Sequence, residues 1–327
     1  RTGQGQCQFA MFEGAGQDYG TIIIADGVNE PFSFRMEGTG SNINTRTYFS
    51  GEVTVTGTKF ATHSEIHDKH LVVAGVEDNL STVFYSKLLD PTDFSGTGSG
   101  SITLSDQIVG LKSFRQELFI FCENSIYELT NLDSTPIIKS VTKNIGCISG
   151  NSIQEIGGDL IFLAPDGLRT IAGTARIDDV ELGSISRKIL PLINNLLANI
   201  QQFTISSMVI RERSQYRLFY HKSGQGQSGQ LGIIGTFKFD ANGVPAFEWS
   251  EAKGMDLKFC ASELNPQNEE VKFGANENGY IYEIDKGNNF DGANINARFQ
   301  TPDMDYGDAG IRKTLYYIKT SIRSEGT

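Results

Sequence analysis

Two apolar runs joined by a short polar turn recur along the chain, which is the sequence form of a β-hairpin. The form is clear in "HLVVAGVEDNLSTVFYS", residues 70–86. It occurs six times, at 21–34, 70–86, 117–129, 159–173, 216–239 and 270–284. The first apolar runs begin at Ile22, Leu71, Leu118, Leu160, Leu218 and Val271, so the spacings by subtraction are 49, 47, 42, 58 and 53 residues.

Further strand-like runs accompany these hairpins. Five of the six are preceded by one, at 59–66, 107–114, 150–156, 204–210 and 257–264, and more candidates lie between the units at 52–60 and 100–105. About four strands every 40 to 50 residues is the pattern of a β-propeller blade. The sequence therefore predicts an all-β chain, a propeller of about six blades over residues 1–300. A pair of β-sandwiches with chance periodicity is the alternative fold.

One segment, residues 184–202, departs from the β pattern. Its apolar residues fall at 185, 189, 192, 193, 196, 197 and 200, which is a helical spacing. Ser184 or Ser186 could cap the start, and Pro191 suits the first turn of the main helix, with any turn before it separate. We expect an inserted helical segment that packs on the propeller rim or on a neighbouring subunit.

Composition narrows the class of protein. The 327 residues include 36 Gly and 8 Pro, and 20% are charged, which is typical of a folded, turn-rich protein. No apolar run approaches the roughly 18 residues that span a bilayer, so we expect a soluble protein without a membrane span. The net charge of −11 disfavours a protein that grips nucleic acid, yet suits a surface past which DNA slides.

The one histidine cluster is a candidate metal site. His63, His67 and His70 lie within eight residues. Their stretch reads as strand, turn, strand, so we expect His63 and His67 to point differently and the turn to be exposed. The sequence favours turn and surface histidines over metal ligands.

Acidic residues provide the remaining candidate chemistry. Asp178 and Asp179 form one pair, and Asp303, Asp305 and Asp308 form a second group. Either could supply the carboxylates of a glycosidase or bind calcium. Acidic loops are commoner than active sites, and we assign no catalytic, cofactor-binding or metal site.

The single tryptophan and the four cysteines favour structural roles. Trp249 is the only tryptophan, which disfavours a sugar-binding propeller with several stacking rings and favours a blade anchor. Cys7, Cys122, Cys147 and Cys260 lie far apart, and none forms a CxxC pair. Cys122 and Cys260 sit in strand-like runs, where a thiol packs as a small hydrophobe.

Several stretches resemble the β-propeller tail nozzle or tail hub proteins of short-tailed bacteriophages, also called tail tubular protein B or DNA-stabilisation proteins. The stretches are "TIIIADGVNEPFSF" (21–34), "KHLVVAGVEDNLSTVFYSKLLDPTDFSG" (69–96), "IVGLKSFRQELFIFCENSIYEL" (108–129), "LIFLAPDGLRTIAG" (160–173), "ELGSISRKILPLI" (181–193) and "RFQTPDMDYGDAGIRKTLYYIKTSIRSEG" (298–326). They follow one another in an order similar to that of the family.

The resemblance implies a structural virion protein and not an enzyme. Such a protein forms a homo-oligomeric ring, usually a hexamer, that closes the tail below the portal and adaptor rings. It retains packaged double-stranded DNA and passes it during ejection without specific binding. The implied location is the virion tail, assembled in the host cytoplasm, with no cofactor. Residues 301–327 are then expected to begin a further strand or platform segment that continues outside this sequence.

Two other functions remain open from the residues alone. One is a propeller glycoside hydrolase or lyase that acts on surface polysaccharide. The other is a cellular propeller that serves as an interaction platform, although the Trp-Asp dipeptide of one such class is absent. Oligomeric state distinguishes the nozzle from the enzyme, because a nozzle must close a ring.

Overall fold

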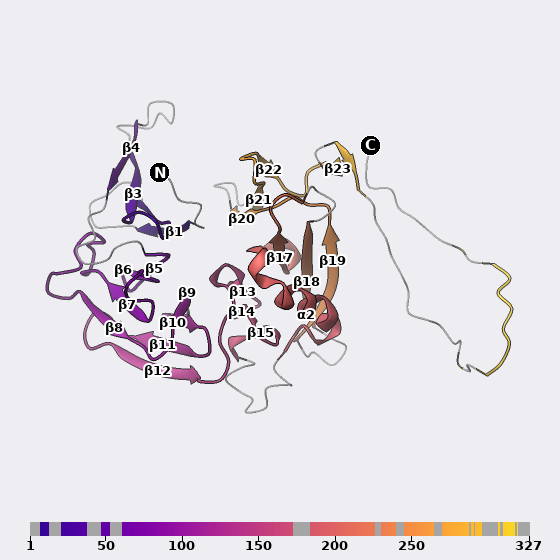
Figure 1. Ribbon diagram of the computed structural model, residues 1–327, viewed down its shortest axis with the longest axis horizontal. Coiled ribbons are helices and arrows are strands. Elements are labelled where there is room, and N and C mark those ends of the chain that lie inside the picture. Colours follow the sequence, from indigo (N-terminus) through magenta and orange to yellow (C-terminus); the bar gives the residue numbers. More distant parts are fainter. Residues whose placement is uncertain are drawn as a thin grey trace.

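The structure is a computed structural model. It describes residues 7–12, 21–37, 47–52, 61–172, 184–225, 230–239, 245–264, 270–287, 289–290, 292–295, 307, 310–317 and 319. In this part of the chain, consecutive strands form six antiparallel sheets that succeed one another around a centre (Figure 1). Each sheet consists of strands that are consecutive in the sequence. The predicted propeller of about six blades is therefore confirmed, and the alternative of two β-sandwiches is not. We number the blades 1 to 6 in chain order.

Blades 1 to 3 each have four strands, ordered as they occur in the chain. Blade 1 holds β1 (Gln8–Phe12), β2 (Thr21–Ala25), β3 (Phe32–Glu37) and β4 (Thr47–Glu52). Blade 2 holds β5 (His63–His67), β6 (His70–Ala74), β7 (Thr82–Tyr85) and β8 (Gly100–Thr103). Blade 3 holds β9 (Ile108–Phe114), β10 (Glu117–Cys122), β11 (Ile126–Thr130) and β12 (Ile137–Thr142).

Blades 4 to 6 vary this plan. Blade 4 has three strands, β13 (Gln154–Ile156), β14 (Asp159–Ala164) and β15 (Gly167–Thr170). Blade 5 has β16 (Thr204–Ile210), β17 (Gln215–His221), β18 (Leu231–Phe239) and β19 (Pro245–Lys253). Blade 6 has β20 (Phe259–Leu264), β21 (Glu270–Ala275) and β22 (Ile281–Glu283), and a short pair, β23 (Asn289–Phe290) and β24 (Ala293–Asn294), follows it.

The six predicted hairpins are the second and third strands of the six blades. For example, residues 117–129 become β10 and β11, in which Leu118 pairs with Leu129 and Phe121 with Ile126. The five preceding runs become the first strands of blades 2 to 6. These first strands lie side by side around the axis, with β5 against β1 and β9, and β16 against β13 and β20.

In blades 2, 3 and 4, the turn between the first and second strands has the same form. The turns are the two-residue pairs Asp68–Lys69, Arg115–Gln116 and Gly157–Gly158, and both residues of each pair have a positive φ. The flanking residues pair directly across each turn, as in His67 with His70. This is the form of a type I′ turn, whose twist matches that of the strands. Only the Gly-Gly pair is a typical sequence for it.

The hydrophobic core consists of layers between adjacent blades rather than one central mass. Separate apolar clusters join blades 1 and 2, 2 and 3, 3 and 4, 4 and 5, and 5 and 6. Phe121 of blade 3 and Phe162 of blade 4, for instance, are fully buried with ring centroids 5.3 Å apart. None of these clusters joins blade 6 to blade 1.

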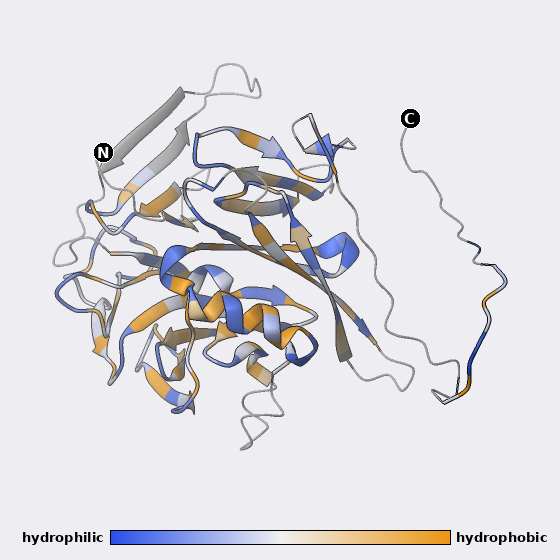
Figure 2. Cartoon of the chain, turned by 45° about the vertical axis from the view of Figure 1, so that its right-hand side comes forward, coloured by the Kyte–Doolittle hydropathy of each residue, from blue (hydrophilic) through white to orange (hydrophobic). Residues whose placement is uncertain are grey.

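The inserted segment 184–202 is helical, as predicted. It comprises a separate 3-10 turn η3 (Arg187–Ile189), the helix α2 (Leu190–Ala198) with Pro191 in its first turn, and a turn η4 (Ile200–Gln202). Ile193 and Leu196 of α2 are buried in the core between blades 4 and 5. Figure 2 shows α2 against the strands with polar and apolar residues alternating around it. Other 3-10 turns are η2 (Gly150–Ser152) and η5 (Arg211–Arg213).

The predicted serine caps are wrong. The helix α2 begins after Ile189, and Ser186, which precedes η3, makes no side-chain cap. The Ser186 hydroxyl instead accepts a 2.9 Å hydrogen bond from the backbone N–H of Leu168, and Ser184 forms a β-bridge with Arg169. Both serines therefore tie the segment to β15. Separately, the described residues contain no helix that is long and apolar enough to cross a membrane.

Candidate functional site

The six blades enclose an axial hollow of about 630 Å³. The first strand of every blade contributes to its wall, and one lining residue from each of blades 1 to 6 is Gln8, Glu65, Lys112, Gln154, Ser207 and Cys260. Because first strands lie closest to the axis, this hollow is the place where all blades meet. It is the first candidate for a functional site.

The charges of the axial hollow offset one another. The Lys112 ammonium lies 3.6 Å from the Glu65 carboxylate, whose oxygen also accepts a 3.2 Å hydrogen bond from the Ser113 N–H. Burial raises the pKa of Glu65, while Lys112 and the Ser113 N–H oppose that shift. The hollow therefore presents an ion pair rather than a cluster of carboxylates.

The uncharged polar groups of the hollow bind one another across blades. The Gln154 amide of blade 4 donates to the Ser207 carbonyl of blade 5 at 3.0 Å, and the Ser207 hydroxyl donates to the Asn151 carbonyl at 2.6 Å. The Ser206 hydroxyl accepts a 2.9 Å hydrogen bond from the Cys260 N–H of blade 6. These contacts hold neighbouring blades in register around the hollow.

On the blade 1 side of the hollow, the wall is apolar and exposed to solvent. Phe9 and Met11 of β1 are 64% and 62% exposed, and they pair across the sheet with Ile24 and Ile22 of β2. Cross-strand partners share a face of the sheet. The intervening residues of β1, such as Phe12, are buried against blade 2. We name this face the blade 1 wall.

A second apolar face lies on blade 6. Ala261 pairs with Phe273, and Ala275 pairs with Ile281, so these residues share one face of blade 6. Phe273 is 44% exposed and Ile281 is 73% exposed. The opposite face, with Cys260, packs on blade 5. We name the exposed face the blade 6 wall; Phe9 and these blade 6 residues line the same hollow.

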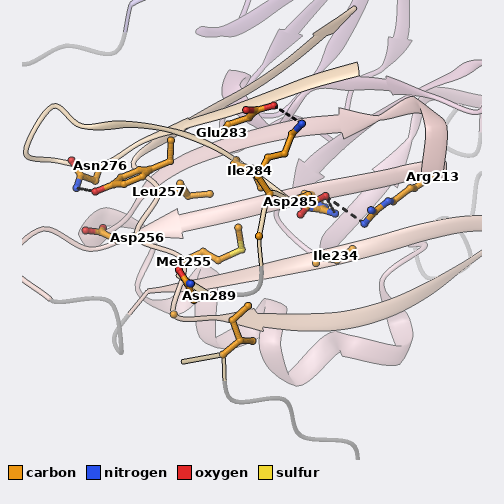
Figure 3. Close-up of a pocket in the computed structure, with 16 residues that line it drawn as sticks. Arg213, Ile234, Met255, Asp256, Leu257, Asn276, Glu283, Ile284, Asp285 and Asn289 are labelled. Carbon is orange, nitrogen blue, oxygen red and sulfur yellow. Dashed lines mark hydrogen bonds and ion pairs between the residues drawn. The ribbon is translucent and has the colours of Figure 1, made fainter. Parts of the chain in front are cut away.

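A second cavity, of about 560 Å³, lies between blades 5 and 6 (Figure 3). Arg217, which is nearly fully buried, donates to both carboxylate oxygens of Asp285 at 2.9 and 2.8 Å, and Arg213 lies 3.4 Å from the same carboxylate. Burial would raise the pKa of Asp285, but Arg217 and Arg213 outweigh it, and the pKa is lowered. Glu283 pairs with Lys286 at 3.3 Å. The charges around this cavity thus neutralise one another.

A buried histidine lies near this cavity. The Nδ1 atom of His221 is 3.1 Å from the Asp256 carboxylate, and its Nε2 atom is 3.5 Å from that of Glu277. The pKa of Glu277 is lowered, first by the Gly224 N–H and also by His221. His221 ends β17 and Glu277 follows β21, so this group joins blades 5 and 6. No local sequence pattern predicts this group, because the three residues are far apart in the chain.

The turn Asp68–Lys69 is exposed, as predicted, but His67 and His70 on either side of it are buried, which corrects the prediction of surface histidines. His67 and His70 are 3% and 1% exposed. They close the turn between β5 and β6, where the His67 Nδ1 atom lies 2.9 Å from the Ser113 hydroxyl and His70 Nδ1 donates to the Ser86 carbonyl. His63 and His67 lie in one regular strand, so they share a face instead of pointing differently. In the described part of the chain, no group of three or more His, Cys, Asp or Glu side chains is arranged so that it could hold a metal ion.

Trp249 anchors a blade, as predicted. Its indole N–H donates a 3.0 Å hydrogen bond to the Ile185 carbonyl, and its ring stacks on Phe247 at 5.3 Å. Asp178, Asp179, Asp303, Asp305 and Asp308 lie outside the described residues.

The cysteines are free thiols in the structure. Cys122 and Cys147 are buried, Cys260 is partly buried and Cys7 is exposed. Cys122 and Cys260 lie in β10 and β20, as their strand-like runs predicted. Burial raises the pKa of Cys122, Cys147 and Cys260 to about 12 in each case.

Comparisons with known proteins do not assign the chain to a family. No family model and no curated protein matches the sequence. Among solved structures, Hsv2 of Kluyveromyces marxianus aligns with a TM-score of 0.42 and 9% identity over 98% of this chain and 79% of its own. Hsv2 of Kluyveromyces lactis gives 0.38 and 11% over 75% and 74%, and a Bacteroides fragilis protein that is proposed to be exported gives 0.39 and 10% over 83% and 84%. These alignments carry no argument about function.

Proposed function

We propose that the chain is a structural protein of a virion tail, a nozzle or hub that forms a ring, retains packaged DNA and passes it during ejection. The observation that carries this proposal is the sequence resemblance to tail nozzle proteins. Its stretches 21–34, 69–96, 108–129 and 160–173 fall on the second and third strands of four successive blades, and 108–129 also includes the first strand β9. The family pattern therefore follows the architecture of the blades.

The loop after β7 illustrates why such a stretch would recur. In "LLDPTDFSG", Asp90 accepts hydrogen bonds from the Thr92 N–H and hydroxyl, and the Asp93 carboxylate accepts the N–H groups of Ser95 and Gly96. These N–H groups lower the pKa of Asp93. Two aspartates thus fold a long loop locally, as Asx turns do.

The propeller axis is not a path for DNA. A hollow of about 630 Å³ corresponds to a cube about 9 Å on a side, and the major groove of a duplex alone is about 12 Å wide. DNA would have to pass through the space enclosed by a ring of copies. The net charge of −11 makes tight binding of phosphates unfavourable in such a channel.

The partners in this proposal are other copies of the chain, a portal-side adaptor and other tail proteins, and the place is the tail of a virion assembled in the host cytoplasm. Negative-stain imaging of the full-length protein, combined with a DNA-binding titration at two salt concentrations, tests it. We expect rings with a central hole, about six copies each, and only weak salt-sensitive binding of duplex DNA. Isolated single propellers that cleave a surface polysaccharide would overturn the proposal in favour of an enzyme.

A further inference from the structure

The blade 1 wall and the blade 6 wall form a cleft with apolar side chains on both sides. Phe9 lines it from blade 1, and Phe273 and Ile281 line it from blade 6. In a closed propeller each blade buries both of its faces against neighbours. Here two faces that are built for burial remain exposed, so the cleft calls for an occupant with apolar groups on two opposite sides.

Residues 311–317, "IRKTLYY", have that character. Ile311, Leu315, Tyr316 and Tyr317 are all exposed, the last two at 91% and 83%, and no strand or helix includes them. In an extended chain, successive side chains point to opposite faces. Ile311, Leu315 and Tyr317 would therefore face one wall while Tyr316 faces the other. A strand that lay on a single sheet would need apolar residues on one face only.

Charge supports the same pairing. Residues 311–317 contain two basic residues, Arg312 and Lys313, and no acidic residue. Glu263 and Glu283 share the exposed face of blade 6 with Phe273, and Glu283 also pairs with Lys286. The carboxylate of Glu263 beside apolar positions complements a basic, apolar strand.

The position of the stretch favours a neighbouring copy as the recipient. In Figure 1, residues 311–317 lie beyond β19 and β23, on the side of the molecule opposite to blade 1. We propose that residues 311–317 of one copy insert between blades 6 and 1 of the next copy. Such a head-to-tail contact repeats from copy to copy and generates a ring when the rotation closes. The inference rests on the proposed ring and names the surface that joins it.

Disulfide trapping tests the contact directly. Cys7 is exposed and lines the hollow beside Phe9. Full-length Leu315→Cys, oxidised as a mixture of ¹⁴N- and ¹⁵N-labelled protein, should form Cys7 crosslinks between isotopically different chains. The double variant Cys7→Ser with Leu315→Cys should form none, and Thr97→Cys, an exposed position on the loop before β8, should give no Cys7 link. A link found only within single chains would show closure by the chain's own segment and overturn the proposal.

Assembly of a charge variant provides the second readout. Leu315→Asp places a charged group in an apolar cleft, so we expect at least tenfold weaker association by light scattering, whereas Thr97→Asp should assemble as wild type does. If wild type forms rings and Leu315→Asp forms the same rings, the contact proposed here is wrong and the ring stands. If wild type stays monomeric at all concentrations, the proposed ring itself is wrong.

Discussion

The indole nitrogen of Trp249 in blade 5 donates its hydrogen bond to the carbonyl of Ile185, at the start of the inserted helical segment. The same ring covers Gly235, where a Cβ atom would lie 2.4 Å from the indole. One side chain thus fixes both the segment and the surface on which it rests. The sequence had indicated an anchor at Trp249 but not what it anchors.

Trp249→Phe should weaken the docking of residues 184–202. It removes the indole donor and part of the stacking on Phe247 while it keeps an apolar ring. Loss of a partly buried hydrogen bond and of packing predicts a decrease of about 1 kcal/mol in the free energy of unfolding. Urea denaturation measures it, and a variant as stable as wild type would contradict the anchoring role.

Asp285→Asn should be more damaging than its conservative chemistry suggests. Arg217 would keep its positive charge in a buried position without its bidentate carboxylate. Breaking such a pair costs about 3 kcal/mol. The matched control is Glu248→Gln, which breaks the exposed pair with Lys238 and should have a small effect. If Asp285→Asn and Glu248→Gln lowered the midpoint of denaturant unfolding by the same amount, this prediction would be contradicted.

Gln116→Gly should stabilise the protein. Gln116 adopts φ +66° in the I′ turn between β9 and β10, a conformation that costs a non-glycine residue about 1 kcal/mol. Arg115 is left in place because its guanidinium donates to the Gly158 carbonyl and lies over Phe114. A rise in melting temperature is expected, and Gly224→Ala, which places Ala at φ +75° in open space, should lower it.

Acid should destabilise blade 2 through His63. Burial lowers the pKa of His63 to about 4, whereas the unfolded side chain titrates near about 6.5. Between these values the unfolded state binds more protons, so the stability that is present above about pH 6.5 is lost as the pH falls towards 4. Denaturation at pH 7.5 and 5.0 should show a smaller pH effect for His63→Gln than for wild type. If wild type and His63→Gln lost the same free energy of unfolding between pH 7.5 and 5.0, the lowered pKa of His63 would be contradicted.

Only one thiol should react quickly in the folded protein. Cys7 is exposed, and partial burial and then Asp26 raise its pKa, whereas burial raises the pKa of Cys122, Cys147 and Cys260 to about 12. A thiol-reactive dye at pH 8 should label about one cysteine in native protein and all four in denaturant. Rapid labelling of two or more native thiols would show that an inner strand opens readily.

The blades were predictable from sequence because a hairpin is a local pattern. Alternating or continuous apolar runs with a turn between them located the second and third strands of all six blades. Short turns between the first and second strands were expected, but their I′ type could not be predicted at Asp68–Lys69 and Arg115–Gln116, since neither pair is typical of a I′ turn. There the pairing of the flanking strands imposes the turn.

The polar sites could not be predicted because their residues are close in space but far apart in the sequence. Nothing near His67 in the sequence shows that Ser113 of blade 3 will meet its ring. The Arg217–Asp285 pair is separated by 68 residues.

On blade 1, Phe9 and Met11 are exposed, whereas Ile23 of the neighbouring strand is fully buried on the opposite face. That exposed apolar surface is the feature that the proposed assembly explains.

The most direct test of this account is the mass of the full-length protein in solution, measured by light scattering over a wide range of concentrations. The account predicts a particle of about six chains whose mass is constant once assembled, as closed symmetry requires. A mass equal to one chain at every concentration would contradict it.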